Sequence, residues 1–179
     1  EQNKWSTMKK YDQVQYDVTV PFARNFAGPM DYTQGAMLNG TRSTYRPSNS
    51  EPMSQGTRCH QLAEYVVFLS PLNMLCDSPT HYDEEPECTD FIAKIPTVWD
   101  ETVALKSEVG EYVAVARRAG NKWYVGALTN WTPRDLTLDL SPLKVAGKTA
   151  VVFKDGANAE KFAQDYEKTT VTVPADGKV

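Results

Sequence analysis

The sequence lacks the motifs of several large enzyme classes. Its 179 residues contain no glycine-rich phosphate loop, no HExxH, no GxSxG and no closely spaced cysteine pair. A nucleotide-binding enzyme, a zinc protease and a simple serine hydrolase therefore have no motif support. Only two histidines are present, His60 and His81. We expect a structural or solvent-exposed role for each of them.

Long apolar runs and a dominant charge are also missing. No apolar stretch approaches the roughly 18–20 residues of a membrane-spanning helix, so we expect no membrane insertion. The 19 Lys and Arg residues are mixed with 23 Asp and Glu residues, for a net charge of −4. Without a basic stripe to meet a phosphate backbone, nucleic acid is excluded as a partner. A composition of 41% hydrophobic and 23% charged residues is typical of a globular protein.

The three cysteines give little information about function or compartment. Cys59, Cys76 and Cys88 are odd in number and widely spaced. This pattern fits neither a disulfide framework nor a zinc site. We expect three buried thiols that pack as small apolar side chains.

The first half of the sequence predicts two short βα units. Two short apolar segments, 26–33 and 72–79, contain aspartates that we expect at strand ends, Asp31 and Asp77. Between them, residues 56–69 carry apolar side chains at helical spacing. Consecutive βα units are typical of a parallel sheet or barrel, in which residues just past the strand ends line the site.

The segments around these units complete the expected first half. Asp17 is predicted to cap a helix over 18–26, and a further short helix is expected over 87–95. The long polar loop over 34–55 is expected to face a substrate, because connections of this length are usually functional. Two parallel βα units cannot close a core by themselves. Because the chain also begins at Glu1 without Met or a signal peptide, we expect a piece of a longer polypeptide.

From residue 99 the apolar periodicity is close to two, which predicts antiparallel strands. Residues 112–118 and 122–129 flank the turn Ala119-Gly120-Asn121, a strong hairpin signal. Further strands are expected over 102–105, 134–140, 149–154 and 169–173, with a short helical excursion over 157–165. The predicted fold class is therefore α/β plus all-β, with a βα part over 1–98 and an antiparallel sheet or sandwich over 99–179.

Carboxylates beside aromatic side chains are the candidate chemistry. They are Glu1 near Trp5, Asp31 beside Tyr32, and Asp77. Glycoside hydrolysis needs one acid to protonate the leaving oxygen and a second group as base or nucleophile. An aspartate at a strand end can equally cap a helix or bind loop amides. The residues alone leave both roles open for the two aspartates.

Eight runs along the chain share one resemblance. They are VPFARN at 20–25, AGPMDYT at 27–33, GTRCHQLA at 56–63, MLCDSP at 74–79, FIA at 91–93, IPTVWDET at 95–102, WYVG at 123–126 and NWTPR at 130–134. In this order they resemble the C-terminal part of glycoside hydrolase family 97, over nearly the whole chain.

The resemblance implies a larger enzyme with an N-terminal β-sandwich, a (β/α)8 barrel and a C-terminal β domain. Residues 1–98 would be the end of the barrel, with its last two βα units, and residues 99–179 the antiparallel β-sandwich domain without its final strand. The family cleaves α-glucosides or α-galactosides with calcium at the site, typically in the periplasm. The implied partners are an oligosaccharide and the missing N-terminal part of the same polypeptide, with a homo-oligomer as a further option.

The resemblance also assigns roles to the candidate residues. In the family a glutamate shortly before a Lys-Trp pair is the general acid, which fits Glu1, while Asp31, Tyr32 and Asp77 would line the sugar site. The base or nucleophile and most calcium ligands lie upstream in the family. The sugar and the stereochemical outcome therefore stay open, and we expect the isolated chain to be inactive. The competing hypothesis is a non-catalytic β-module for carbohydrate contact or oligomerisation.

Overall fold

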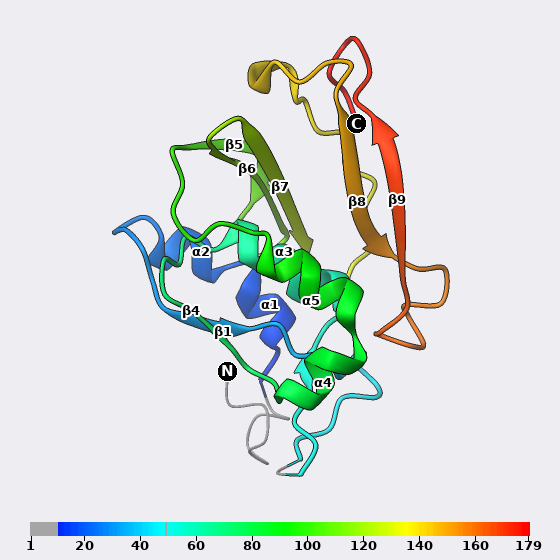
Figure 1. Ribbon diagram of the computed structural model, residues 1–179. Helices are drawn as coiled ribbons and strands as arrows, with labels where there is room; N and C mark the ends of the chain where they lie inside the picture. Colours follow the sequence, from blue (N-terminus) through cyan, green and yellow to red (C-terminus); the bar gives the residue numbers. More distant parts are fainter. Residues whose placement is uncertain (1–10, 49) are drawn as a thin grey trace.

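The computed structural model describes residues 11–48 and 50–179, with helices and short strands in the first half and longer strands in the second (Figure 1). The helices of the first half are α1 (Gln13–Asp17), α2 (Val20–Arg24), α3 (Arg58–Val67), α4 (Pro79–Glu84) and α5 (Pro86–Ala93). Its strands are β1 (Tyr32–Gln34), β2 (Asn39–Gly40), β3 (Ser54–Gln55) and β4 (Asn73–Leu75). The second half contains β5 (Glu101–Glu108), β6 (Tyr112–Ala119), β7 (Lys122–Thr129), the 3-10 helix η2 (Ser141–Leu143), β8 (Thr149–Asp155) and β9 (Tyr166–Thr172).

Strands β1 and β4 form a parallel pair that is connected through α3. Tyr32 pairs with Asn73, and Gln34 pairs with Leu75. The prediction that both strands end in an aspartate is wrong for Asp31, because β1 begins at Tyr32. Asp77 does follow β4. The two carboxylates therefore belong to opposite ends of the strand pair.

The helix predictions are right for α3 and wrong near Asp17. Residues 56–69 contain α3, and the Thr57 side chain caps it by accepting a hydrogen bond from the amide of His60 at 3.1 Å. Asp17 is not a cap: it is the last residue of α1, which Asp12 caps. Helix α2 begins three residues later, after Thr19. The carboxylate of Asp17 is held in a buried polar network instead.

The acidic segment after β4 forms a helix that the sequence analysis did not predict. Ser78 caps α4 by accepting a hydrogen bond from the amide of His81, and Pro79 occupies the first turn. Both residues favour the start of a helix. The serine side chain satisfies a free amide, and proline has no amide hydrogen that would need a partner there. Among the described residues, no helix combines the length and the apolar character needed to cross a membrane.

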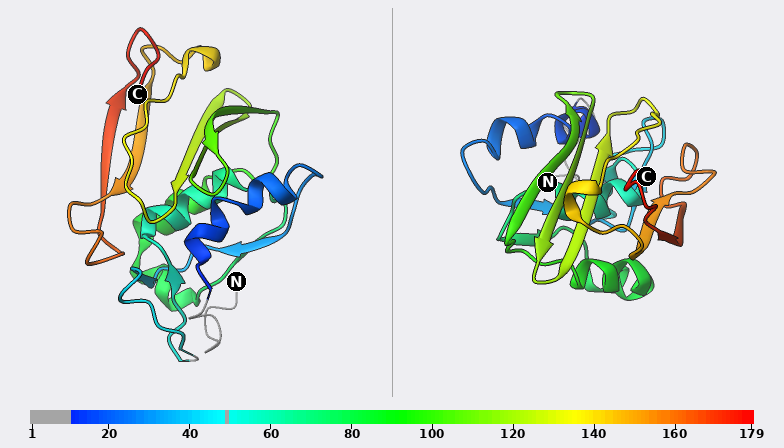
Figure 2. Two further views of the ribbon diagram at one scale, coloured as in Figure 1. Left: turned by 180° about the vertical axis from the view of Figure 1, so that it is seen from behind. Right: turned by 90° about the horizontal axis from the view of Figure 1, so that it is seen from above.

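The second half contains two separate antiparallel sheets, β5-β6-β7 and β8-β9 (Figure 2). The predicted hairpin is confirmed: the pairing of β6 with β7 runs from Tyr112 and Thr129 to Ala119 and Lys122, and Gly120 in the turn has φ 59°. The predicted strand over 134–140 is wrong, because this segment makes only one isolated bridge, between Asp139 and Lys178. The predicted helical excursion over 157–165 is a series of turns.

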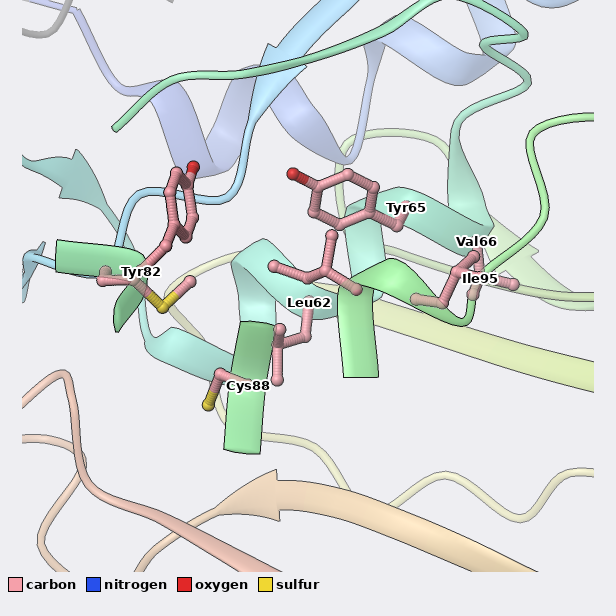
Figure 3. Close-up of a cluster of buried hydrophobic side chains, with 8 residues drawn as sticks. Leu62, Tyr65, Val66, Tyr82, Cys88 and Ile95 are labelled. Atoms are coloured by element: carbon pink, nitrogen blue, oxygen red, sulfur yellow. The ribbon is translucent and has the colours of Figure 1, made fainter. Parts of the chain in front are cut away.

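The hydrophobic cores cross the boundary between the two halves. The cluster in Figure 3 joins Leu62 and Val66 of α3 with Tyr82 of α4 and Cys88 of α5. Partly buried aromatic residues of the second half pack against this cluster: Trp99, Tyr124, Phe153 and Tyr166. A second cluster likewise joins residues near α2 and α3 with β6 and β7. The helices and the antiparallel sheets therefore stabilise each other.

Arg117 of β6 caps the C-terminal end of α3. Its side chain is 4% exposed and donates hydrogen bonds to the carbonyl oxygens of Val66 at 2.6 Å and Val67 at 3.0 Å. Burial lowers the pKa of Arg117. Nearby, a Cβ added to Gly126 of β7 would lie 2.8 Å from the Cβ of Val66. The sheet β5-β6-β7 thus contacts α3 directly.

We expect Arg117→Met to lower the free energy of unfolding by about 1–3 kcal/mol, because it leaves buried carbonyl groups without their donors. The methionine keeps the aliphatic bulk of the side chain. The matched control is Arg118→Met on the same strand, whose ion pairs with Asp100 and Glu101 lie at the surface. Surface pairs of this kind contribute at most about 1 kcal/mol. Urea denaturation of both variants measures the difference, and equal losses would contradict the capping role.

Candidate functional site

The structure does not bring the four predicted site residues together. Glu1 lies outside the described residues. Asp31 is exposed, just before β1, whereas Asp77 lies beyond the opposite end of the strand pair. Tyr32 is half-buried at the start of β1.

The hydroxyl group of Tyr32 is bound inside the protein. It donates a hydrogen bond to Asp17 Oδ1 at 2.7 Å and accepts one from Gln13 Nε2 at 2.6 Å. Its ring packs edge-on against Phe68, with the ring centroids 4.6 Å apart. These contacts connect β1 to α1 and to the end of α3.

Asp77 organises the loops that follow β1 and β4. Its side chain is 1% exposed. Oδ2 accepts a hydrogen bond from the amide of Met37 at 2.8 Å, and Oδ1 accepts one from the amide of Ser78 at 2.7 Å. Oδ1 also lies 2.6 Å from His81 Nδ1. The hydrogen bond and the charge of Asp77 raise the pKa of His81. The carboxylate therefore ties the loop after β1 to the start of α4.

A buried polar network that the sequence analysis missed joins α1 to α3. His60 Nε2 lies 3.1 Å from Asp17 Oδ2 and 3.3 Å from Glu64 Oε1. All three side chains are buried, and Gln61 Nε2 donates to Glu64 Oε1 at 3.0 Å. The spacing of His60 and Glu64, one helical turn apart, was the available signal. The structural role expected for His60 agrees with this arrangement.

This network is the one group of potential metal ligands among the described residues, and it does not fit calcium. One atom from each of Asp17, His60 and Glu64 lies within 4.8 Å of the others. Calcium takes six to eight oxygen ligands. Here one donor is an imidazole nitrogen, and Asp17 already accepts hydrogen bonds from Gln13 and Tyr32. Asp17, His60 and Glu64 therefore do not form a calcium cage.

A cleft of about 490 Å³ lies between the loop after β1, α4 and the turns after β8. The residues that line it include Asn39, Arg58 and Phe162. Arg58 is buried and forms an ion pair with Glu85 at 2.9 Å. Burial opposes its charge, but hydrogen bonds to Glu85 and Cys88 give a net increase in the pKa of Arg58.

The second half of the chain also holds the start of α1. Trp131 Nε1 donates a hydrogen bond to Asp12 Oδ1 at 2.7 Å, and Arg42 forms an ion pair with Asp12 at 3.2 Å. The guanidinium of Arg42 lies 5.9 Å from the centre of the Trp131 ring. Gln15 adds a hydrogen bond to the carbonyl oxygen of Gly110. Trp131 belongs to the NWTPR run, whose structural role was not predicted.

The pairing of His81 with Asp77 predicts a pH-dependent stability. Because the pKa of His81 is raised in the folded state, the stabilisation is fully present below the ordinary histidine pKa of about 6.5 and is lost as the pH rises through the raised value. We expect His81→Asn to remove this dependence. NMR titration measures the pKa of His81, and urea denaturation across pH 5–9 measures the free energy of unfolding. Titration of His81 below about 6.5 would contradict the prediction.

Comparison with known proteins places this architecture in a family. Residues 98–179 match the family described as "Glycosyl-hydrolase 97 C-terminal, oligomerisation". The whole chain is 55% identical over 179 residues to a protein named "Retaining alpha-galactosidase" from Bacteroides thetaiotaomicron, of which it spans 27%.

Solved structures share the fold over 98% of the chain. A β-arabinopyranosidase superimposes with a TM-score of 0.80 at 29% identity, and the chain spans 26% of it. A glycoside hydrolase family 97 enzyme from Pseudoalteromonas sp. strain K8, in complex with panose, has a TM-score of 0.77 at 27% identity, and the chain spans 28% of it. The chain thus spans about a quarter of the length of the proteins that it matches. Residues 98–179 thus form a glycosyl-hydrolase 97 C-terminal domain, and the chain as a whole is similar to the C-terminal part of such enzymes.

Proposed function

We propose that this chain forms the C-terminal part of a retaining glycoside hydrolase that cleaves terminal α-galactosidic bonds of oligosaccharides. The observation that supports this most is the 55% identity to a retaining α-galactosidase along all 179 residues. α-Glucosidic bonds are the alternative within the same proposal. A β-arabinopyranoside is a second candidate substrate, because an enzyme of that activity shares the fold.

In this proposal residues 1–98 complete a (β/α)8 barrel and residues 99–179 form its C-terminal β-sandwich domain. The parallel unit β1-α3-β4 would supply the last two strands of the barrel. Leu72, Met74 and Leu75 are exposed around β4. Parallel sheets are normally covered on both faces, so these side chains are consistent with a strand that neighbouring barrel strands cover. The preceding part of the polypeptide would provide those strands.

The proposed general acid is Glu1. In a retaining mechanism it protonates the leaving oxygen and later activates water, while a second carboxylate about 5–5.5 Å away attacks the sugar. That second carboxylate would come from the preceding part of the polypeptide. The contacts of Tyr32 and Asp77 favour supporting roles, because their polar atoms already hold α1 and the loop after β1. Sugar contact by Asp31, Tyr32 or Asp77 stays a prediction.

Calcium and a periplasmic location complete the proposal. A bound calcium ion would supply positive charge beside the acid and the sugar oxygens. Its ligands would lie mostly outside this chain, which agrees with the poor fit of the Asp17, His60 and Glu64 group to this ion. The alternative function is a non-catalytic module for carbohydrate contact or oligomerisation. The description of the matched family, which names oligomerisation, favours that role for residues 98–179.

We expect Glu1→Gln in the full-length enzyme to lower kcat by about 10²–10⁴-fold on oligosaccharides with a poor leaving group. Aryl α-galactosides with an activated phenolate leaving group need little protonation, so their glycosylation step should be much less affected. Single-turnover rates on both substrates measure the contrast. Asp31→Asn serves as the matched carboxylate control, for which we expect no such dependence on the leaving group. An equal loss on both substrates would argue against the acid role of Glu1.

The isolated 179-residue chain should not turn over aryl α-galactosides or α-glucosides, because the second carboxylate is absent. The measurement is phenolate release, with the full-length enzyme as the positive control. Turnover by the purified chain above the level of a mock purification would contradict the proposed division of the catalytic groups.

A further inference from the structure

The cleft between the loop after β1, α4 and the turns after β8 lies where a barrel would hold its substrate. Residues 37–39 follow β1, and His81, Glu84 and Glu85 follow β4. They therefore stand at the carboxyl end of the parallel pair, the end at which α/β barrels place their sites. The opposite wall comes from the second half of the chain, through residues 161–164.

The floor of the cleft is rigid. Arg58 is buried there, and its Nε donates a hydrogen bond to Asn39 Oδ1 at 2.9 Å. Both of its terminal nitrogens lie close to the carboxylate of Glu85, at 2.9 and 3.2 Å. A planar guanidinium held by two groups has little freedom to move. Glu85 remains partly exposed and can accept hydrogen bonds from a ligand.

The wall from the second half presents an aromatic side chain to solvent. Phe162 is 65% exposed. Its segment is fixed, because the amide of Asn158 donates to Asp165 Oδ2 at 2.8 Å and the carbonyl oxygen of Ala163 accepts from the amide of Arg58 at 2.7 Å. The backbone beside Phe162 is thus anchored to the first turn of α3. A large apolar ring held in water at the edge of a polar cleft is a platform for stacking.

The charges around the cleft are balanced. Three cationic and three anionic side chains line it, in addition to His81, which is bound by Asp77: Arg46, Arg58, Lys161, Glu51, Glu84 and Glu85. A site for a phosphate or a metal cation would carry an excess of side chains of the opposite charge. A neutral ligand with many hydroxyl groups can use both the donors and the acceptors. The volume of about 490 Å³ also falls in the range of roughly 300–1,000 Å³ typical of small-molecule sites.

We propose that this cleft binds the outer sugar units of the oligosaccharide substrate, with Phe162 as the stacking platform. The charged side chains at its walls would hydrogen-bond the sugar hydroxyl groups. The inference rests on the proposed glycosidase function and adds to it a second binding role for the C-terminal half of the chain. Residues of this half would then contribute to the choice of substrate length.

The test compares a long and a short substrate in the full-length enzyme. We expect Phe162→Ala to raise KM for the tetrasaccharide stachyose about three- to tenfold, the range that the loss of one stacking contact provides. KM for an aryl α-galactoside, which has a single sugar unit, should stay unchanged, as should kcat for both. The matched control is Phe26→Ala, because Phe26 is 93% exposed and is not among the residues that line the cleft.

Phe162→Leu separates stacking from packing. Leucine keeps an apolar side chain but lacks the ring, so it should raise KM for stachyose as alanine does, without a change in Tm. An equal effect of Phe162→Ala on both substrates, or no effect on either, would overturn the proposal. A fall in Tm with a wild-type KM for Phe162→Leu would also overturn it, because Phe162 would then pack against another part of the polypeptide.

Direct binding distinguishes failure of this site from failure of the proposed activity. Stachyose is titrated into the full-length protein by calorimetry, with and without the Phe162→Ala change. If the wild-type enzyme hydrolyses neither substrate, weaker stachyose binding by Phe162→Ala than by Phe26→Ala would still support the cleft. Identical binding of stachyose by both variants would overturn it.

Discussion

Helix α3 is held at both of its ends by hydrogen bonds from the second half of the chain, and the rest of the structure depends on these contacts. The first amides and the last carbonyl groups of a helix have no partners within the helix itself. Here Ala163 accepts a hydrogen bond from the amide of Arg58, and Arg117 donates to the carbonyl oxygens of Val66 and Val67. Because Gly126 brings β7 against the C-terminal half of α3, the helix and the antiparallel sheet form one packed unit.

The sides of α3 extend this connection to the remaining elements. One side carries His60 and Glu64, which hold the buried carboxylate of Asp17 and with it helix α1. Another side contributes Leu62 and Val66 to the core shared with α4 and α5. The start of α1 is held in turn by Trp131 through Asp12. The second half of the chain therefore contacts α1 both through α3 and directly. Its role in the fold is larger than that of an appended module.

Local signals in the sequence were sufficient where short-range chemistry decides the structure. Thr57 caps α3, and the turn at Gly120 forms the hairpin of β6 and β7, since both depend on neighbouring residues. The failures arise where distant contacts decide. Asp17 has the chemistry of a helix cap, but its carboxylate is taken by His60, 43 residues away. Residues 134–140 alternate like a strand, yet their backbone partners are the last residues of the chain, which pair over a very short span.

The same distinction explains the candidate site. Strand-end carboxylates are reasonable site predictions, but an aspartate is also a compact acceptor for several amides. Asp77 satisfies two amides and His81, so its charge serves the geometry of the loops around it. The cleft above Arg58 could not be foreseen from spacing, because residues 37–58 and 81–85 line it together with residues 161–164, which lie far along the sequence. Only the packing of β8 and β9 against the core around α3 brings Phe162 to the carboxyl end of β1 and β4, and a change in that packing would alter the cleft without touching any residue that lines it.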